Sequence, residues 1–354
     1  MKLAQHRFVT ACMLAAAVLL GPSGHAAVTY MATPDVPTDL ANSTYAGSQI
    51  VRIDGATATS ALNLPAGAVV DAIHRRADGK WLISLESAFK LGGVLFDPRD
   101  VILVDGTTYT LQLGGASAGI PADTNLDTLL QVGSDLVVGF DVPVTIGGVP
   151  YDPADLLRYQ AGTWSLYFDA SATIPPIPSS TNLVGADLLG AKLVLAFDIP
   201  VTLGATYNPG DLVAWNGSAF SLLQAGATVA WPASSTIAGL ALAGSPGESL
   251  NLRISKASSS QLRFTWDPSC SGNATDYGIY MGTLGSFASH AMLDCSDGGG
   301  DRSELESMPA GNKYFLVVPL ATVEEGSYGT NSAGIERARG VTTCRTTRAL
   351  APCP

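Results

Sequence analysis

The chain has 354 residues, of which 47% are hydrophobic and 14% are charged, and its formal net charge at pH 7 is −11. This composition is typical of a protein with a sizeable hydrophobic core, and it excludes a disordered polymer. A chain this acidic is poorly suited to nucleic acid or to an anionic membrane surface, because both require lysine and arginine to neutralise phosphate groups. The length favours about two domains.

Residues 1–26 have the three parts of a cleavable export signal. Lys2 and Arg7 give a positive start, Phe8–Leu20 is an apolar run, and Gly24–Ala26 offers small residues to a signal peptidase. The apolar run is shorter than the roughly 20 residues that span a bilayer, so cleavage is favoured over a membrane anchor. The sequence therefore predicts a protein that does not span a membrane and that is secreted, held at the cell surface or retained in the periplasm.

One motif occurs three times: an aromatic residue, Asp or Asn, proline, any residue, aspartate and an aliphatic residue. Its copies are Phe96–Val101, Tyr151–Leu156 and Tyr207–Leu212. A second motif, F-D-x-P-V-T, stands ahead of the last two copies, at Phe140–Thr145 and Phe197–Thr202. An aromatic residue follows each copy at the same distance: Tyr109, Trp164 and Phe220. Self-similarity at a period of about 55 residues predicts repeats that each bury an apolar face on the next.

Each repeat is predicted to form about four short antiparallel strands, because brief apolar runs such as Leu136–Phe140 alternate with turn signals. Four strands per unit predict an all-β, propeller-like domain over residues 27–243. Ile50–Gly55 parallels Val101–Gly106 and belongs to a partial first unit. We hypothesise that the strand-like Ile237–Ala243 completes this unit and closes the ring.

The two motifs and the aromatic strand after them resemble tandem repeats of uncharacterised exported bacterial proteins. The resemblance covers roughly residues 48–235. It implies a β-repeat array and brings no established activity with it.

The acidic positions of the repeats recur at fixed places: Asp97, Asp100, Asp141, Asp152, Asp155, Asp198 and Asp211. One interpretation is calcium, bound by the carboxylates of Asp97, Asp100, Asp152, Asp155 and Asp211 together with turn carbonyls. The other is turn chemistry, since Asp-Pro and Asn-Pro begin turns and an aspartate accepts from nearby backbone N–H groups. Asn208 replaces the first aspartate of the third copy, so turn chemistry is favoured, and no cofactor is predicted.

Gly115–Gly119 matches G-x-S-x-G, the nucleophile elbow of α/β-hydrolases, with Ser117 at the nucleophile position. The elbow requires a helix after the turn, and no helical pattern follows here. A catalytic serine also needs a base, and only His74 and His290 lie beyond the leader. A carboxylate pair of the glycosidase kind is not visible in a sequence, because its separation depends on the fold. We assign no catalytic residue.

Beyond Gly244–Gly247 the repeat stops, and residues 248–354 are predicted to form a second domain. Leu262–Trp266 alternates apolar and polar residues as a half-buried strand does. Trp266 matches the core tryptophan of fibronectin type III domains, and Met308–Tyr314 resembles the turn that leads to their tyrosine corner. The segment thus resembles a fibronectin type III-like β-sandwich, which implies a module that spaces or binds.

Cys270, Cys295, Cys344 and Cys353 all lie in this second domain. An even number of cysteines in an exported chain predicts disulfides, and the C-x2-C spacing typical of zinc sites is absent from the sequence. Three pairings are open, and the sequential one, Cys270–Cys295 with Cys344–Cys353, is preferred because it closes the shortest loops. The nearby basic residues are interpreted as a solvated face: Arg337, Arg339, Arg345 and Arg348.

Together these features predict a non-catalytic extracellular protein used for binding, adhesion or surface structure. Its expected partner is an extracellular protein or a glycan. The alternative function is a secreted hydrolase, an esterase or a polysaccharide-degrading enzyme, with its site on the repeat domain.

Overall fold

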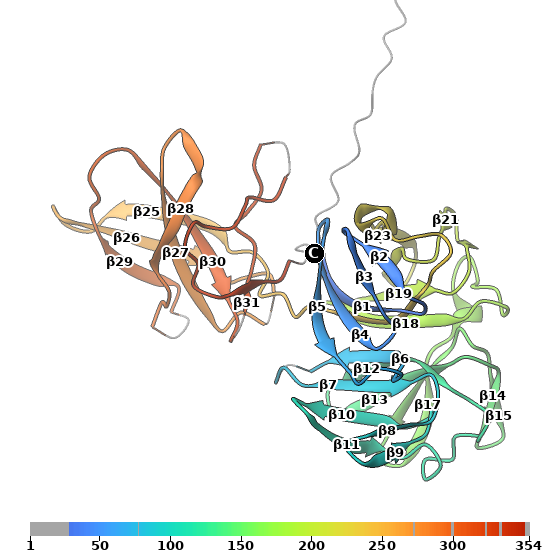
Figure 1. The fold of residues 1–354 in the computed structure, drawn as a ribbon. Coiled ribbons are helices and arrows are strands. Elements are labelled where there is room, and N and C mark those ends of the chain that lie inside the picture. Colours follow the sequence, from blue (N-terminus) through green and yellow to red (C-terminus); the bar gives the residue numbers. More distant parts are fainter. Residues whose placement is uncertain are drawn as a thin grey trace, which may run out of the picture.

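The computed structural model describes residues 28–76, 78–271, 273–298, 301–322, 324–332 and 335–350. They form two bodies built from strands, a repeat domain and a sandwich (Figure 1), so the expected all-β class is confirmed. The predicted leader and Cys353 lie outside the described residues. Among the helices of these ranges, none is long and apolar enough to cross a membrane.

Within the described residues, four sheets of four antiparallel strands form the blades of a propeller. From the central axis outward, the blades are β24 (Ile237–Leu242), β1 (Thr29–Pro34), β4 (Gln49–Asp54) and β5 (Thr57–Asn63); β6 (Val70–Arg75), β7 (Trp81–Leu85), β10 (Val101–Asp105) and β11 (Thr108–Leu113); β12 (Leu126–Val132), β13 (Asp135–Phe140), β16 (Leu156–Gln160) and β17 (Thr163–Phe168); and β18 (Leu183–Leu189), β19 (Lys192–Phe197), β22 (Leu212–Trp215) and β23 (Phe220–Gln224).

Each blade also carries a short hairpin between its second and third strands. The hairpins are β2 (Thr38–Leu40) with β3 (Ser43–Tyr45), β8 (Phe89–Leu91) with β9 (Val94–Phe96), β14 (Val144–Ile146) with β15 (Val149–Tyr151), and β20 (Val201–Thr202) with β21 (Thr206–Tyr207). Two 3-10 turns, η1 (Ala170–Ala172) and η2 (Gly226–Val229), follow the outermost strands of the third and fourth blades.

Strand β24 closes the ring. It comes from the C-terminal end of the repeat domain and pairs antiparallel with β1, with Tyr30 opposite Leu242. The four innermost strands, β24, β6, β12 and β18, also contact one another in cyclic order around the axis. The hypothesis that Ile237–Ala243 completes the first blade is confirmed. Because the first and last strands share one sheet, the ring opens only if this blade is broken.

The hydrophobic core lies between neighbouring blades rather than within them. One cluster joins Tyr30 of the first blade to Leu212 of the fourth, and another joins Leu130 of the third blade to Leu195 of the fourth. Strands β1 and β24 are buried along their whole length, since blades cover both of their faces. A single blade would leave an apolar face exposed, which explains why the unit is repeated.

Glycine is required where two innermost strands approach most closely. A Cβ on Gly185 of β18 would lie 2.5 Å from the Cβ of Leu240 on β24. We expect Gly185→Ala to lower the free energy of unfolding of the propeller by about 1–3 kcal/mol, the usual cost of overpacking. Chemical denaturation measures this, with Gly244→Ala as the control because its Cβ would meet Asn273 at an ordinary 3.5 Å. Equal midpoints for both variants would contradict the expectation.

The second domain packs a three-stranded sheet against a five-stranded one. The first sheet comprises β25 (Leu250–Lys256), β26 (Gln261–Asp267) and β29 (Ser303–Ser307), and the second comprises β28 (Ser286–Asp294), β27 (Asp276–Thr283), β30 (Lys313–Leu320), β31 (Glu324–Glu325) and β32 (Thr347–Arg348). Trp266 of β26 packs between the sheets with Tyr277 of β27 and Val317 of β30. The sandwich is as expected, while its membership of the fibronectin type III family stays a prediction.

The disulfide pairing differs from the preferred one. Cys295 is bonded to Cys344, 49 residues further along the chain, so sequential pairing is wrong for both cysteines. The reason is that the segment before Cys344 lies beside β28, with the Val341 N–H donating to His290 O at 2.7 Å. Spatial neighbours therefore decided the pairing, and the shortest loop did not.

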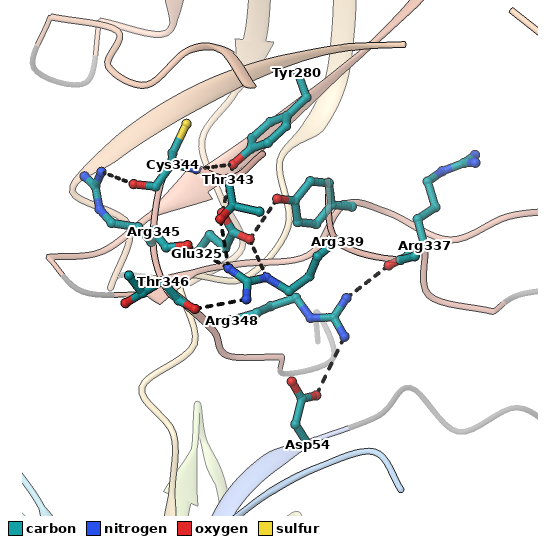
Figure 2. Close-up of polar contacts among 12 residues, drawn as sticks. Asp54, Tyr280, Glu325, Arg337, Arg339, Thr343, Cys344, Arg345, Thr346 and Arg348 are labelled. Carbon is teal, nitrogen blue, oxygen red and sulfur yellow. Dashed lines mark hydrogen bonds and ion pairs between the residues drawn. The ribbon is translucent and has the colours of Figure 1, made fainter. Parts of the chain in front are cut away.

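The C-terminal arginines do not form a solvated face. Arg339 Nε donates to Oε1 of Glu325 at 2.9 Å, and that carboxylate also accepts from the Tyr280 and Tyr328 hydroxyls at 2.8 and 2.7 Å (Figure 2). Glu325 is fully buried. Arg345 donates to the Ala321 carbonyl at 2.9 Å. A buried charge must be paired, and here the arginines pair it and bind the carbonyls of their own tail.

The same tail returns to the propeller. Leu350 exchanges backbone contacts with Thr29 at the start of β1, its O accepting from the Thr29 N–H at 3.0 Å. Ala349 is buried in the core between the first two blades. Arg52 of β4 pairs with Glu324 at 2.7 Å, and Arg348 lies 3.7 Å from Asp54 (Figure 2). The end of the second domain therefore joins the two bodies.

Candidate functional site

All four innermost strands begin on one face of the propeller, because the loops from each blade to the next lie there. We call it the aspartate face, after Asp35, Asp141 and Asp198. The sandwich is joined to the opposite face, where β24 ends and the tail meets Thr29. In Figure 1 the hairpin β14–β15 and strand β21 lie on the side of the propeller away from the sandwich. The aspartate face is thus free of the second domain.

The aspartates that name this face hold the innermost strands in place. Each ends a second strand and accepts from the N–H just before the innermost strand, at 2.9–3.0 Å: Asp35 from Thr236, Asp141 from Asn125 and Asp198 from Asn182. The conserved geometry in three blades explains the F-D-x-P motif as a turn device.

The second acidic position of the other motif also binds backbone N–H groups. One oxygen of Asp100 accepts from Asp97 N and the other from Gly115 N, each at 2.9 Å. Asp155 and Asp211 repeat these bonds in the next two blades, at 2.8–3.0 Å. These are the bonds that turn chemistry predicts. In the part of the chain that the structure describes, no group of three or more His, Cys, Asp or Glu is arranged to hold a metal ion.

Asp71 of β6 and Asp127 of β12 lie at the centre of the aspartate face, at equivalent positions of adjacent innermost strands. They are only 5% and 7% exposed. Their carboxyl groups are hydrogen-bonded to each other, and Glu86 is a further carboxyl neighbour of Asp71. Asn125 Nδ2 donates to Asp71, and Asn182 Nδ2 donates to Asp127. The two repeats thus build one carboxyl pair.

This pair retains a proton. Burial, followed by the charge of Asp127, raises the pKa of Asp71, and burial also raises the pKa of Asp127. Two carboxyl groups in contact do not ionise together without a large cost. Glycosidase carboxyl groups stand about 5 Å apart or more, which leaves room for the sugar or a water. A pair in direct hydrogen-bond contact does not have that spacing.

The pair gives a pH-dependent stability. A carboxyl whose pKa is raised on folding contributes stability below the unfolded value near 4, and this is lost as the pH rises through the raised value. We expect the melting temperature of the wild type to fall from pH 5 to pH 9 more steeply than that of Asp71→Asn. The difference should be on the order of 1–3 kcal/mol, because a tenfold change in ionisation is worth about 1.4 kcal/mol.

The control for this experiment is Asp123→Asn, which removes an exposed carboxylate from the same face. Its profile should follow that of the wild type. Parallel profiles for the wild type and Asp71→Asn would mean that Asp71 does not retain the proton.

His74 and Asp187 face each other deeper along the axis, from β6 and β18. The His74 Nδ1 and Asp187 Oδ1 atoms are 4.0 Å apart. Asp187 also accepts from the Leu242 N–H at 2.7 Å, and its burial raises its pKa to about 6. Burial, with a smaller effect of Arg76, lowers the pKa of His74 to about 4, so the imidazole is neutral at pH 7. The pair braces opposite blades.

Ser117 is exposed in the turn after β11. Within the described ranges no hydrogen bond joins it to His74 or to His290. His290 is fully buried in the sandwich, where Nδ1 lies 3.0 Å from the Tyr314 hydroxyl and Nε2 lies 3.0 Å from Ala338 O. The three residues of the serine hypothesis are therefore in three places. The contact of Tyr314 with His290 also gives the predicted tyrosine corner a different partner.

Apolar side chains surround the carboxyl pair on the aspartate face. The residue after each of the three naming aspartates is exposed: Val36 at 46%, Val142 at 37% and Ile199 at 40%. Ile174, in the loop between the third and fourth blades, is 78% exposed. Single exposed apolar residues need no explanation, but the same position in three blades forms a repeated surface. We call Val36, Val142 and Ile199 the apolar ring.

A second hollow lies at the rim between the first and fourth blades. It is an open groove of about 690 Å³ lined mainly by small residues of the β2–β3 turn and of η2. Its charged side chain, Asp39, accepts from the Thr44 hydroxyl. The groove places no group with catalytic chemistry beside another.

Sequence reasoning did not single out Asp71, Asp127 or Asp187. The available signal was a charged residue inside a run that otherwise reads as a buried strand, where an aspartate is rare unless it is paired. The exposed valine and isoleucine of the F-D-x-P motif were visible as a repeat, but nothing in the sequence showed that they are exposed.

No family model matches this chain, and no curated protein matches it. Among solved structures, the extracellular domain of a putative one component system from B. thetaiotaomicron is 8% identical, with a TM-score of 0.28 over 94% of this chain and 58% of its own. Virginiamycin B lyase from Staphylococcus aureus is 12% identical, with a TM-score of 0.26 over 90% and 86% of the two chains. The FN1-FN3 domains of chicken CNTN1 are 10% identical, with a TM-score of 0.19 over 73% and 93%.

The chain thus spans little more than half the length of the first of these structures. Likenesses of this size concern the fold alone, and they say nothing about activity.

Proposed function

We propose that this protein is a non-catalytic extracellular binding protein that holds its partner on the aspartate face of the propeller. The apolar ring carries the proposal, because exposed apolar side chains at one repeated position are what a binding surface requires and what a solvated face avoids. The ring lies on the face that the sandwich leaves free. The partner class is an extracellular protein or a glycan.

The separation of the chemical groups supports a role without catalysis. Ser117 is exposed, His74 is neutral on the axis, and His290 is buried in the other domain. A nucleophile needs its base within hydrogen-bond reach. The alternative hydrolase would also act on one of the described carboxyl pairs, and the Asp71–Asp127 pair is too close for that of a glycosidase.

A binding screen against extracellular proteins and glycans tests the proposal. The variant Val142→Ser/Ile199→Ser removes two members of the ring, and Val149→Ser/Leu166→Ser removes two apolar residues of similar exposure elsewhere on the third blade. We expect a ligand whose dissociation constant rises at least tenfold in the first variant and less than threefold in the second. Ligands that ignore both changes would overturn the proposal.

The same samples test the alternative. Hydrolysis of an ester or polysaccharide panel that disappears in Ser117→Ala or Asp127→Asn would show an enzyme, and it would replace the binding proposal.

A further inference from the structure

We infer that the partner is a basic protein segment, which places its apolar side chains on Val36, Val142 and Ile199 and its lysine and arginine side chains over the carboxylates around them. This inference rests on the proposed function and adds the chemistry of the partner. It follows from how charge is distributed between the two faces of the propeller.

Acidic residues gather at the strand ends and loops of the aspartate face. They are Asp35, Asp71, Glu86, Asp97, Asp100, Asp123, Asp127, Asp141, Asp152, Asp155, Asp169, Asp198 and Asp211. Lys90 and Arg99 are the basic residues of the described propeller on this side, and Arg99 is paired with Asp97 at 3.0 Å. The face is therefore strongly negative.

The remaining basic residues of the propeller lie toward the opposite face. They are Arg52, Arg75, Arg76, Lys80, Arg158 and Lys192. Several are paired with acids there, as Lys80 is with Asp105 at 2.8 Å and Arg158 is with Asp135. Charge is thus balanced on the side of the sandwich and unbalanced on the free side.

The polar groups at the centre of the aspartate face are mostly acceptors. Asn125 and Asn182 spend Nδ2 on the two buried aspartates, and their Oδ1 atoms have no hydrogen-bond partner among the described residues. Carboxylates and amide oxygens are complemented by side chains that only donate, and lysine and arginine are the side chains with donors and no acceptor. An acidic or neutral partner does not supply them.

The apolar ring decides between a protein and a simple polycation. Charge alone gives attraction that is screened by salt and has little specificity. Apolar side chains at three blades add contacts that salt does not weaken. A segment with both basic and apolar residues satisfies both features of the face.

The test uses three soluble probes: poly-L-lysine, a random copolymer of lysine and leucine, and a random copolymer of glutamate and leucine. Calorimetry or surface binding at 50 mM and 300 mM NaCl gives the dissociation constants. We expect the lysine–leucine copolymer to bind at least fivefold tighter than polylysine, and the glutamate–leucine copolymer not to bind. Equal binding by the acidic copolymer would overturn the inference.

Two charge variants locate the site. Asp123→Lys/Asp152→Lys reverses two exposed carboxylates on the aspartate face, and Asp78→Lys/Asp105→Lys makes the same change in net charge on the opposite face. We expect the first variant to raise the dissociation constant for the lysine–leucine copolymer at least tenfold and the second less than threefold. Equal effects would show that only net charge matters, and would overturn the inference.

The outcomes separate this inference from the proposed function. In Val142→Ser/Ile199→Ser, the preference for the lysine–leucine copolymer over polylysine should disappear. If a ligand found by screening depends on this pair but is not basic and ignores Asp123→Lys/Asp152→Lys, the proposed function holds and the basic partner is refuted.

Discussion

Replacing Cys295 and Cys344 together with alanine is expected to lower the free energy of unfolding of the sandwich by about 4 kcal/mol. The two cysteines are bonded across 49 residues, and the cost follows from the loop entropy that a cross-link of this length removes from the unfolded chain. The bond also fixes the segment before Cys344 against β28, where Val341 N and Thr342 O bond His290 and Met292. Denaturation with a separate signal for each domain, such as hydrogen exchange, measures the effect.

The reduced wild type serves as the comparison, because reduction removes the same bond without changing a side chain. Slower hydrogen exchange should persist in the propeller blades away from Thr29, while exchange in β30 and in the tail should rise. A double variant as stable as the oxidised wild type would contradict the assigned pairing.

The second large effect is expected from Glu325→Ala, at about 3–5 kcal/mol. The change leaves the Arg339 guanidinium and the Tyr280 and Tyr328 hydroxyls without the buried carboxylate that they share, and an unpaired buried group is costly. Burial and the hydrogen bonds to Glu325 raise the pKa of Tyr328, so this hydroxyl stays protonated and needs an acceptor. Since Glu324 and Arg348 link the tail to β4, the loss should also loosen the joint between the domains.

Glu304→Ala is the matched control, because the Glu304 carboxylate accepts from the adjacent Leu305 N–H on a partly exposed strand. Its cost should stay near 0.5 kcal/mol, as for most surface changes. Hydrogen exchange at Thr29 and in the tail distinguishes a local loss from release of the tail. If both variants unfold alike, the carboxylate does not organise the tail.

The propeller could be predicted from the sequence because its information is local and repeated. The copies at Tyr151–Leu156 and Tyr207–Leu212 place the same turn after the same strand, and the aspartate of each accepts from N–H groups close along the chain. Closure by β24 could be proposed because Ile237–Ala243 is an apolar run without a unit of its own. Such patterns survive in sequence since they concern neighbouring residues.

The candidate site was less visible, because its members come from different repeats. Asp71 and Asp127 stand in separate strands, and each has an ordinary neighbourhood in the sequence. Only the packing of adjacent innermost strands brings their carboxyl groups into contact and raises their pKa values. The exposure of the apolar ring likewise depends on which face the sandwich leaves uncovered.

By itself, the sequence determined the strands, the turns and the order of the blades, because alternation of apolar residues and the hydrogen bonds of aspartate turns act over short distances. It also determined that the second domain is cross-linked, but not how. The tertiary structure alone decided that Cys295 pairs with Cys344 and that the C-terminal arginines surround Glu325. The physical reason is the same in each case: disulfides, buried ion pairs and shared protons depend on distances in space, and sequence separation does not fix those distances.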